Sequence, residues 1–214
     1  MAAIIYRRPG ERWVPDVGAA PDPKTRVGPL TDKVHSNDWR QMRFGEWGDR
    51  FEPEEVRTEF WLRSRHKALS DTFSVHGCWG VSAAFRAAVE ALEPGLHQFF
   101  PIRIRRPKGG PILRPDGREA GPDEFFLINC LSVVDCVIPE LSSGPGVRRR
   151  ERGGVMFSAE EDRLVISREA VAGRHLWHSK TDGVSGYFFI SDALRDLLVA
   201  RKLQGFVIRP VGEA

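Results

Sequence analysis

The chain has 214 residues, of which 41% are hydrophobic and 29% are charged, and its formal net charge is +3. This composition excludes wholesale disorder, and the length predicts a single domain with a sizeable buried core. The charge is too small to indicate a nucleic-acid-binding protein by itself.

The cysteine content and the apolar segments predict where the protein works. The chain has three cysteines, Cys78, Cys130 and Cys136. An odd number of cysteines without CxxC spacing is typical of proteins in a reducing compartment. The apolar stretch near Met1 is too short for a signal peptide, and no apolar run is long enough to span a bilayer. We therefore expect a cytoplasmic protein that makes no membrane contact.

The first 37 residues are rich in proline, glycine and charge, with turn signals at Arg8-Pro9-Gly10 and Pro21-Asp22-Pro23. They predict an irregular N-terminal segment, 1–37, packed on a main domain, 38–214. Within the main domain, Pro53-Glu54-Glu55 suits the start of a helix, because acidic residues there favour the helix dipole.

A capped helix between two strands is predicted from residue 80 onward. Ser82 is a natural N-cap, Phe85 and Val89 lie on one helical face, and Pro94-Gly95 ends the helix. A strand candidate follows at residues 99–102.

The same plan returns near the C-terminus. Tyr187–Ile190 predicts a strand, Ser191 caps a helix whose stripe includes Leu194 and Leu198, and Gly205 ends it before a strand at 206–208. The fold class predicted is α+β, with two similar strand–helix–strand units. The two units could result from an ancient duplication, or they could be two independent cases of a common strand–helix–strand arrangement, and both explanations remain open.

Between the units, Pro107 to Pro122 predicts a hairpin or loop, followed by an apolar segment at 125–138 and an arginine-rich loop at 142–154. Asn129 and Asp135 interrupt the apolar segment. Burying either one unpaired would cost about 1–3 kcal/mol, so we expect both to be hydrogen-bonded.

No catalytic or metal-binding pattern is complete. Cys130 and Cys136 lie in apolar surroundings, which favours buried hydrophobic side chains. His76 and Cys78 are adjacent enough for a thiol or metal site, but no second ligand pair stands near them. GxSxG, HExxH and Walker patterns are absent from the sequence. We expect no enzyme, cofactor or metal, and keep a thiol or metal enzyme as the weakest alternative.

Arginines form two clusters, Arg103 to Arg106 and Arg148 to Arg152. The second cluster suits contact with phosphates or with an acidic protein surface, and a solvated loop is the simpler interpretation of it.

Several segments resemble a bacterial immunity protein family of polymorphic toxin systems, whose type member is myxobacterial. The segments are Leu69-Ser-Asp71-Thr-Phe73, Gly80-Val-Ser82, Phe100-Pro-Ile, Phe126-Leu-Ile-Asn129 with Asp135 and Ser142 downstream, Leu164-Val-Ile-Ser, Arg174-His-Leu-Trp, and Phe189-Ile-Ser-Asp-Ala-Leu-Arg-Asp-Leu-Leu continuing to Leu203-Gln-Gly-Phe-Val. Together they cover roughly residues 40–211, and the final segment is the most specific.

The resemblance implies an antitoxin that binds and neutralises a cognate secreted toxin, encoded by an adjacent gene, without cofactor or turnover. The alternative is a nucleic-acid-binding accessory protein that uses the arginine clusters. The residues that we predict to contact the partner are Arg148, Arg149, Arg150, Arg152, Trp177, His178, Glu54 and Glu55.

Overall fold

The computed structural model describes residues 2–6, 17–18, 48–63, 67–75, 78–149, 155–158, 162–181, 184 and 187–214. Helices and strands are both present, as the predicted α+β class requires. The helical elements are η2 (Pro53–Glu55), α1 (Ala83–Glu90) and α2 (Asp192–Ala200). The strands are β1 (Ala3–Tyr6), β2 (Val17–Gly18), β3 (Glu59–Leu62), β4 (Thr72–Val75), β5 (Cys78–Ser82), β6 (Gln98–Arg105), β7 (Phe125–Asn129), β8 (Val133–Val134), β9 (Arg148–Arg149), β10 (Val155–Met156), β11 (Val165–Ile166), β12 (Leu176–Ser179), β13 (Phe188–Ile190), β14 (Val207–Pro210) and β15 (Gly212–Glu213).

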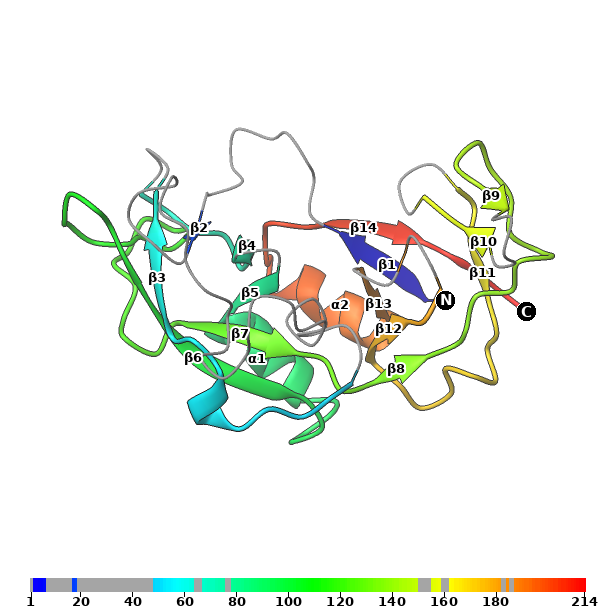
Figure 1. Ribbon diagram of the computed structural model, residues 1–214, viewed down its shortest axis with the longest axis horizontal. Helices are drawn as coiled ribbons and strands as arrows, with labels where there is room; N and C mark the ends of the chain where they lie inside the picture. The colour runs from blue at the N-terminus through cyan, green and yellow to red at the C-terminus, as the bar shows by residue number, and fades with distance from the viewer. Residues whose placement is uncertain are drawn as a thin grey trace.

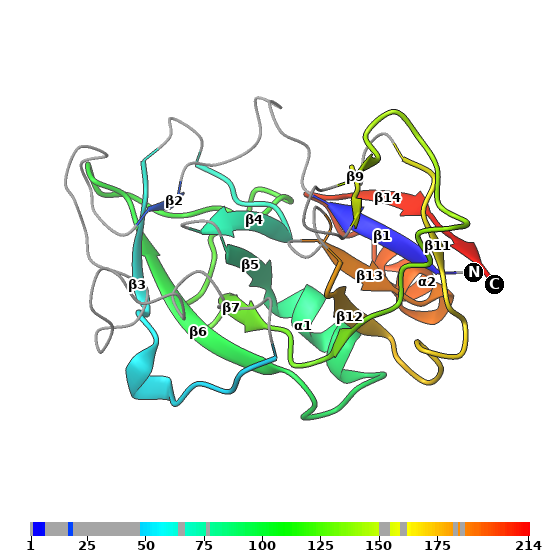
Figure 2. The ribbon, with the colours of Figure 1, turned by 45° about the vertical axis from the view of Figure 1, so that its right-hand side comes forward.

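Two large β structures stand on either side of the helices. A closed barrel has the strand order β2-β3-β6-β7-β5-β4, and a five-stranded sheet has the order β14-β1-β13-β12-β8. Figure 1 shows the barrel on the left, the sheet on the right, and α1 and α2 between them. The turned view in Figure 2 shows the same separation.

Alternating side chains explain why these strands are buried on both faces. Phe125 and Leu127 of β7 fill the barrel, whereas Phe126 and Ile128 between them face the helices. In the sheet, Phe188 of β13 packs toward the helices, and its neighbour Phe189 packs into a further apolar cluster. Covering both faces requires consecutive apolar residues, so these strands appear in the sequence as continuous apolar runs.

The two predicted strand–helix–strand segments share one topology. In the barrel, β7 lies between β5 and β6 and is antiparallel to both, and β4 pairs with the outer side of β5. In the sheet, β1 lies between β13 and β14 and is antiparallel to both, and β12 pairs with the outer side of β13. The orders β4-β5-β7-β6 and β12-β13-β1-β14 therefore correspond strand for strand. A common origin of the two units stays a prediction.

Both helix starts repeat the same local bonding. The Ser82 hydroxyl accepts the Phe85 N–H at 3.2 Å and donates to the Asp71 carboxylate at 2.7 Å, while the Ser82 N–H donates to the Asp71 carbonyl at 2.8 Å. The two predicted N-caps, Ser82 and Ser191, are thus confirmed.

In the second unit, the Ser191 hydroxyl accepts the Leu194 N–H at 3.2 Å and lies 2.8 Å from Nδ1 of His175. The Ser191 N–H donates to the His175 carbonyl at 3.1 Å. In both units, the N-cap serine is therefore held by the residue directly before a neighbouring strand, which is Asp71 before β4 and His175 before β12.

The N-terminal segment differs from the prediction. Residues 3–6 are not irregular but form β1, which lies inside the sheet with Ile4 and Ile5 fully buried. The proline and glycine signals that indicated irregular structure begin only after these four residues. Apart from Val17 and Gly18, residues 7–47 lie outside the described part of the chain.

The two polar residues of the apolar segment behave differently from each other. Asn129 is fully buried, and its amide donates to the Asp49 carbonyl at 2.7 Å and to Gln98 Oε1 at 2.9 Å, as predicted. Asp135 is exposed, because the chain leaves the core between β8 and Cys136. The expectation of a buried, hydrogen-bonded Asp135 is therefore wrong.

None of the helices in the described part of the chain is long and apolar enough to cross a membrane.

Candidate functional site

Trp177 and His178, two of the predicted partner-contact residues, are core residues. Trp177 is 1% exposed and stacks on Phe189 with ring centroids 6.0 Å apart. His178 is fully buried, with Nδ1 2.8 Å from the Tyr187 carbonyl oxygen. Because β12 is covered on both faces, neither side chain reaches the surface, so they cannot contact a partner directly from these positions.

The predicted acidic contacts lie on the surface. Glu54 and Glu55 form part of η2, whose N-cap is Glu52. Glu54 is exposed and Glu55 is partly exposed, with its carboxylate accepting the Glu52 N–H at 3.0 Å. Both remain open to contact, and no arrangement around them marks a binding site.

The second arginine cluster begins on a short hairpin. Arg148 and Arg149 form β9, which pairs with β10, and Arg148 is exposed. Arg150, Arg152 and the side chain of Arg149 lie outside the described part of the structure.

A single buried carboxylate holds the base of this β9–β10 hairpin. Asp162 is 1% exposed and accepts the Gly146 N–H at 2.8 Å and the Ser158 N–H at 2.7 Å. A Cβ at Gly144 would collide with the same carboxylate, which explains a glycine there. Asp162 therefore joins the chain before β9 to the chain after β10.

Replacing Asp162 with alanine should loosen the hairpin locally. Two hydrogen bonds to a buried charged acceptor are lost, which we expect to cost about 2 kcal/mol of local opening free energy. Amide hydrogen exchange at Gly146 and Ser158 should then accelerate about 30-fold. Asp123→Ala, at an exposed carboxylate, serves as the control, and equal exchange rates in the two variants would contradict this role.

The first arginine cluster lies at the other end of the molecule, beside an open groove of about 530 Å³. Arg103 and Arg105 project from β6, and Arg106 follows it. Arg105 pairs with Glu59 at 2.9 Å, with both side chains largely exposed. The groove is lined by the three arginines together with Trp61, Ile102, Ile104, Pro107, Gly109, Gly110, Pro111, Ile112, Glu119, Ala120, Gly121, Pro122 and Phe125.

The wall of the groove is the predicted hairpin between β6 and β7, visible in green at the left of Figure 1. Backbone hydrogen bonds hold it closed, from Ala120 N–H to the Ile112 carbonyl and from Arg114 N–H to the Arg118 carbonyl, both at 2.8 Å. Leu113 exchanges backbone hydrogen bonds with residues 67–69, and Arg114 forms an ion pair with Glu124. The wall is therefore fixed before any partner binds.

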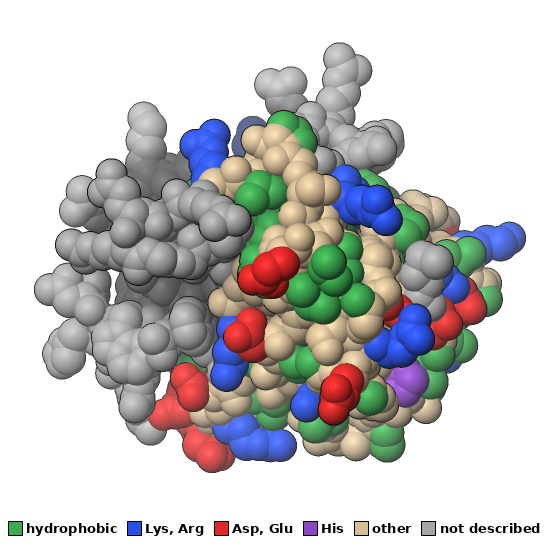
Figure 3. Space-filling view, turned by 90° about the vertical axis from the view of Figure 1, so that its right-hand side faces the viewer, with side chains coloured by type: hydrophobic (Ala, Val, Ile, Leu, Met, Phe, Trp, Pro, Cys, Tyr) green, Lys and Arg blue, Asp and Glu red, His purple; other side chains and the backbone are tan. Residues whose placement is uncertain are grey.

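The opposite end of the molecule carries no comparable concentration of charge among its described residues. Figure 3 views the end where both termini lie, and basic and acidic side chains alternate over it. Among the described residues, the arginine groove combines a cluster of like charges with apolar lining residues, so we take it as the candidate binding surface. The sequence signal for it was the Arg103–Arg106 cluster, but the apolar residues that line the groove come from distant segments.

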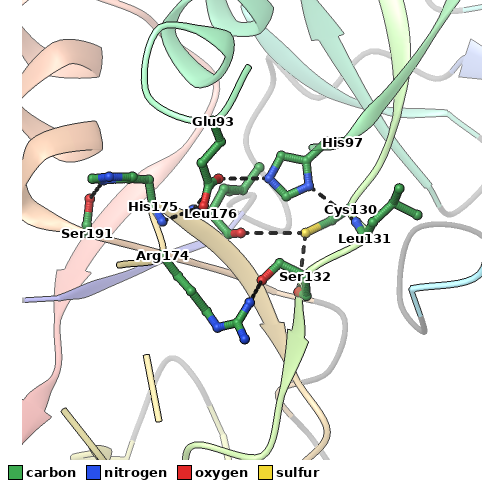
Figure 4. Close-up of polar contacts among 9 residues, drawn as sticks. All are labelled: Glu93, His97, Cys130, Leu131, Ser132, Arg174, His175, Leu176 and Ser191. Atoms are coloured by element: carbon green, nitrogen blue, oxygen red, sulfur yellow. Dashed lines mark hydrogen bonds and ion pairs between the residues drawn. The ribbon is translucent and has the colours of Figure 1, made fainter. Parts of the chain in front are cut away.

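A buried polar cluster joins the barrel to the sheet (Figure 4). Glu93, in the turn after α1, accepts the backbone N–H groups of His175 at 2.8 Å and Leu176 at 3.0 Å. His97 Nε2 lies 2.8 Å from the same carboxylate, and His97 Nδ1 accepts the Leu131 N–H at 3.2 Å. Since Nδ1 is an acceptor, the ring proton lies on Nε2 and points at Glu93.

The nearby thiol is not activated for chemistry. Cys130 is fully buried and donates toward the carbonyls of Ser132 and Leu176. Burial raises the pKa of the Cys130 thiol to about 12, so it stays protonated at neutral pH. Burial also raises the pKa of Cys136. Both cysteines are buried, as predicted; they follow different strands.

The described residues do not form the thiol or metal site that His76 and Cys78 could have suggested. Cys78 lies in β5, and His76 falls outside the described part of the chain. No group of three or more His, Cys, Asp or Glu side chains among the described residues is placed to hold a metal ion.

The Glu93 carboxylate makes stability depend on pH. Burial alone would raise its pKa, but the hydrogen bonds from His97, His175 and Leu176 outweigh burial and hold the pKa below the ordinary 4.5. Because the folded-state pKa is lowered, the ionised carboxylate contributes its full stabilisation at pH values above the unfolded-state pKa. That stabilisation is lost as the pH falls through the folded-state pKa. The free energy of unfolding in urea should therefore fall as pH decreases below about 4.5. Glu93→Gln should remove part of that slope, and an unchanged slope would contradict the assignment.

Two polar junctions join the barrel to the sheet, and the segments that carry the family resemblance supply all their residues except Glu93. At the first, Asp71 accepts the Ser82 hydroxyl and the Gln204 N–H at 2.8 Å, and the Thr72 hydroxyl donates to the Gly205 carbonyl at 2.8 Å. At the second, Glu93 binds the backbone of residues 175–176. These segments thus help to fasten the barrel to the sheet.

A comparison with curated proteins finds no match. The model of the immunity protein family Imm11 matches residues 9–213, which is nearly the whole chain. The matched range covers the barrel, both helices and most of the sheet, including both polar junctions. The protein therefore belongs to the Imm11 immunity protein family.

Proposed function

We propose that the protein is an antitoxin that neutralises a cognate secreted toxin by binding it in the cytoplasm of the producing bacterium, in a polymorphic toxin system used in bacterial competition. The observation that carries this proposal is the family match over residues 9–213. Neutralisation requires a stable complex and no turnover, and the toxin is proposed to be encoded by an adjacent gene.

The character of the described residues supports binding over catalysis. The buried Glu93 and Asp71 carboxylates are occupied in joining the barrel to the sheet, and the buried Cys130 thiol is protonated. The arginine groove, by contrast, combines charge with apolar surface on a fixed wall. Such a combination is typical of interface centres, where arginine and aromatic residues are enriched.

Co-expression with the adjacent toxin candidate tests the proposal. The toxin alone should arrest growth of a heterologous host, and co-expression of this chain should restore growth. The two purified proteins should co-elute as a one-to-one complex in size-exclusion chromatography with light scattering. Failure of every neighbouring toxin candidate to bind or to be neutralised would overturn the proposal.

Nucleic-acid binding is the second candidate, favoured by Arg103 and Arg106, which have no side-chain partner among the described residues. It predicts binding of labelled DNA or RNA at micromolar concentration or tighter, weakening steeply as salt increases. Absence of binding at both low and physiological salt would eliminate it.

A further inference from the structure

We propose that the arginine groove, defined by Arg103, Arg105, Arg106 and the apolar residues between β3, β6 and the 107–122 hairpin, is the surface that receives the toxin, and that it binds an acidic segment carrying an apolar side chain. The proposal rests on the proposed antitoxin function and specifies the interface for it.

The charge of the groove determines the charge of its occupant. Three guanidinium groups lie along one short stretch of chain, and the carboxylate of Glu59 pairs with Arg105 alone. Arg103 and Arg106 make no side-chain ion pair with any described residue, and Arg103 is exposed. Guanidinium groups bind carboxylates through two parallel hydrogen bonds, so an acidic segment complements this rim.

The apolar lining favours a protein segment over a nucleic acid. Trp61 and Ile104 in the groove lining are half-buried and offer a surface for an aliphatic or aromatic side chain. Ile112 and Phe125 lie deeper and are buried in the core of the barrel. Glu119 also lines the groove, and its carboxylate would repel phosphates and carboxylates alike, so the apolar lining and not this charge distinguishes the two occupants. Single-stranded nucleic acids bind where several aromatic rings stack successive bases, whereas this groove has only Trp61 and Phe125 and the latter is buried.

The fixed wall makes the groove suitable for tight binding. The hairpin wall is closed by its own backbone hydrogen bonds and is anchored to residues 67–69 by the bonds of Leu113, at 2.8 and 2.9 Å. A surface that is ordered before association loses less conformational entropy on binding, and that saving appears as affinity. The three arginines lie on β6 or directly after it, outside the sheet, and none of them takes part in either polar junction.

Charge reversal at Arg103 and Arg106, which make no ion pair with a described residue, tests the proposal. The toxin that co-purifies with the wild-type chain is the probe, and its dissociation constant is measured by biolayer interferometry at two salt concentrations. Arg103→Glu/Arg106→Glu should weaken binding about 100-fold or more and should reduce growth rescue. The conservative Arg103→Lys/Arg106→Lys variant should weaken binding less, because it keeps the charge and loses the paired hydrogen bonds.

The matched control has the same change in net charge at a distant site. Lys180 and Arg163 are exposed, have no side-chain partner among the described residues, and lie in the sheet half of the molecule. Lys180→Glu/Arg163→Glu should leave the dissociation constant within about threefold of the wild type, because only long-range screened electrostatics change. Thermal melting of each variant verifies that it is folded.

Each outcome decides between the two proposals. If the groove variant and the wild type bind the toxin equally well, the groove is not the toxin-binding surface, and the proposed antitoxin function is unaffected. Equal weakening in the groove variant and the control would also overturn the groove, because net charge would then explain the effect. Failure of the wild type to bind any toxin candidate would overturn both proposals. Loss of binding to a labelled 20-nucleotide DNA strand, with toxin binding unchanged, would assign the groove to nucleic acid instead.

Discussion

Replacing Gly205 with alanine is expected to lower the free energy of unfolding by about 3 kcal/mol. Gly205 adopts a φ of +100°, which side chains rarely adopt, and a Cβ there would collide with the Thr72 backbone carbonyl. Relieving the collision would separate Gly205 from Thr72, whose hydroxyl donates to the Gly205 carbonyl at 2.8 Å. Urea unfolding followed by circular dichroism measures the loss.

Gly109→Ala is the matched control for this prediction. Gly109 also has a positive φ, +74°, but a Cβ there would meet no atom within 4 Å. The control should therefore report only the backbone strain, about 1 kcal/mol. If both variants lose the same stability, the junction between β4 and the loop before β14 is not as tight as the structure indicates.

The second large effect is expected for Glu93→Gln, which should destabilise the fold by about 3 kcal/mol at neutral pH. Three hydrogen-bond donors converge on the carboxylate, namely the backbone N–H groups of His175 and Leu176 and the His97 ring. A glutamine offers one acceptor oxygen and one NH₂ group, so at least one donor would face another donor in the buried cluster. Chemical denaturation at pH 7 measures the change.

Glu90→Gln, at the last residue of α1, provides the comparison for Glu93 in the turn that follows. Glu90 pairs with Arg86 at 3.2 Å, and about a third of each side chain is exposed. An ion pair of this kind contributes at most about 0.5 kcal/mol, so the control should unfold almost as the wild type does. A comparable loss in both variants would show that the three hydrogen bonds to the Glu93 carboxylate do not cause its effect on stability.

Together these two predictions connect the family segments to stability. Asp71, Ser82 and Gly205 meet at one junction, and residues 174–176 meet Glu93 at the other. Because the segments are used to join the halves of the fold, their substitution should lower the amount of folded protein before it alters the affinity for a toxin. Measuring the dissociation constant on the folded fraction separates the two effects.

The local features that sequence predicted correctly are those decided within a few residues. The caps at Ser82 and Ser191 follow from a serine placed before an amphipathic run, and the 107–122 hairpin follows from its glycines and prolines. The full burial and bonding of Asn129 also followed, because an amide inside an apolar strand must find partners.

The failures concern residues whose environment is made by distant segments. A four-residue apolar stretch, residues 3–6, gives no sign that it will lie between β13 and β14, since that pairing joins opposite ends of the chain. Trp177 and His178 looked suitable for an interface because their types are common there, yet coverage of both faces of β12 buries them. Asp135 is exposed because the chain turns outward after β8.

The sequence by itself determined the class of the fold, the two capped helices and the segments that resemble the immunity family, because each of these is encoded by neighbouring residues. Only the tertiary structure decided that β1 completes the sheet, that two polar junctions join the barrel to the sheet, and that Arg103 and Arg106 lie beside a groove with apolar lining residues. The physical reason is that burial and pairing are properties of surfaces brought together by folding, so they depend on contacts between residues far apart in the chain.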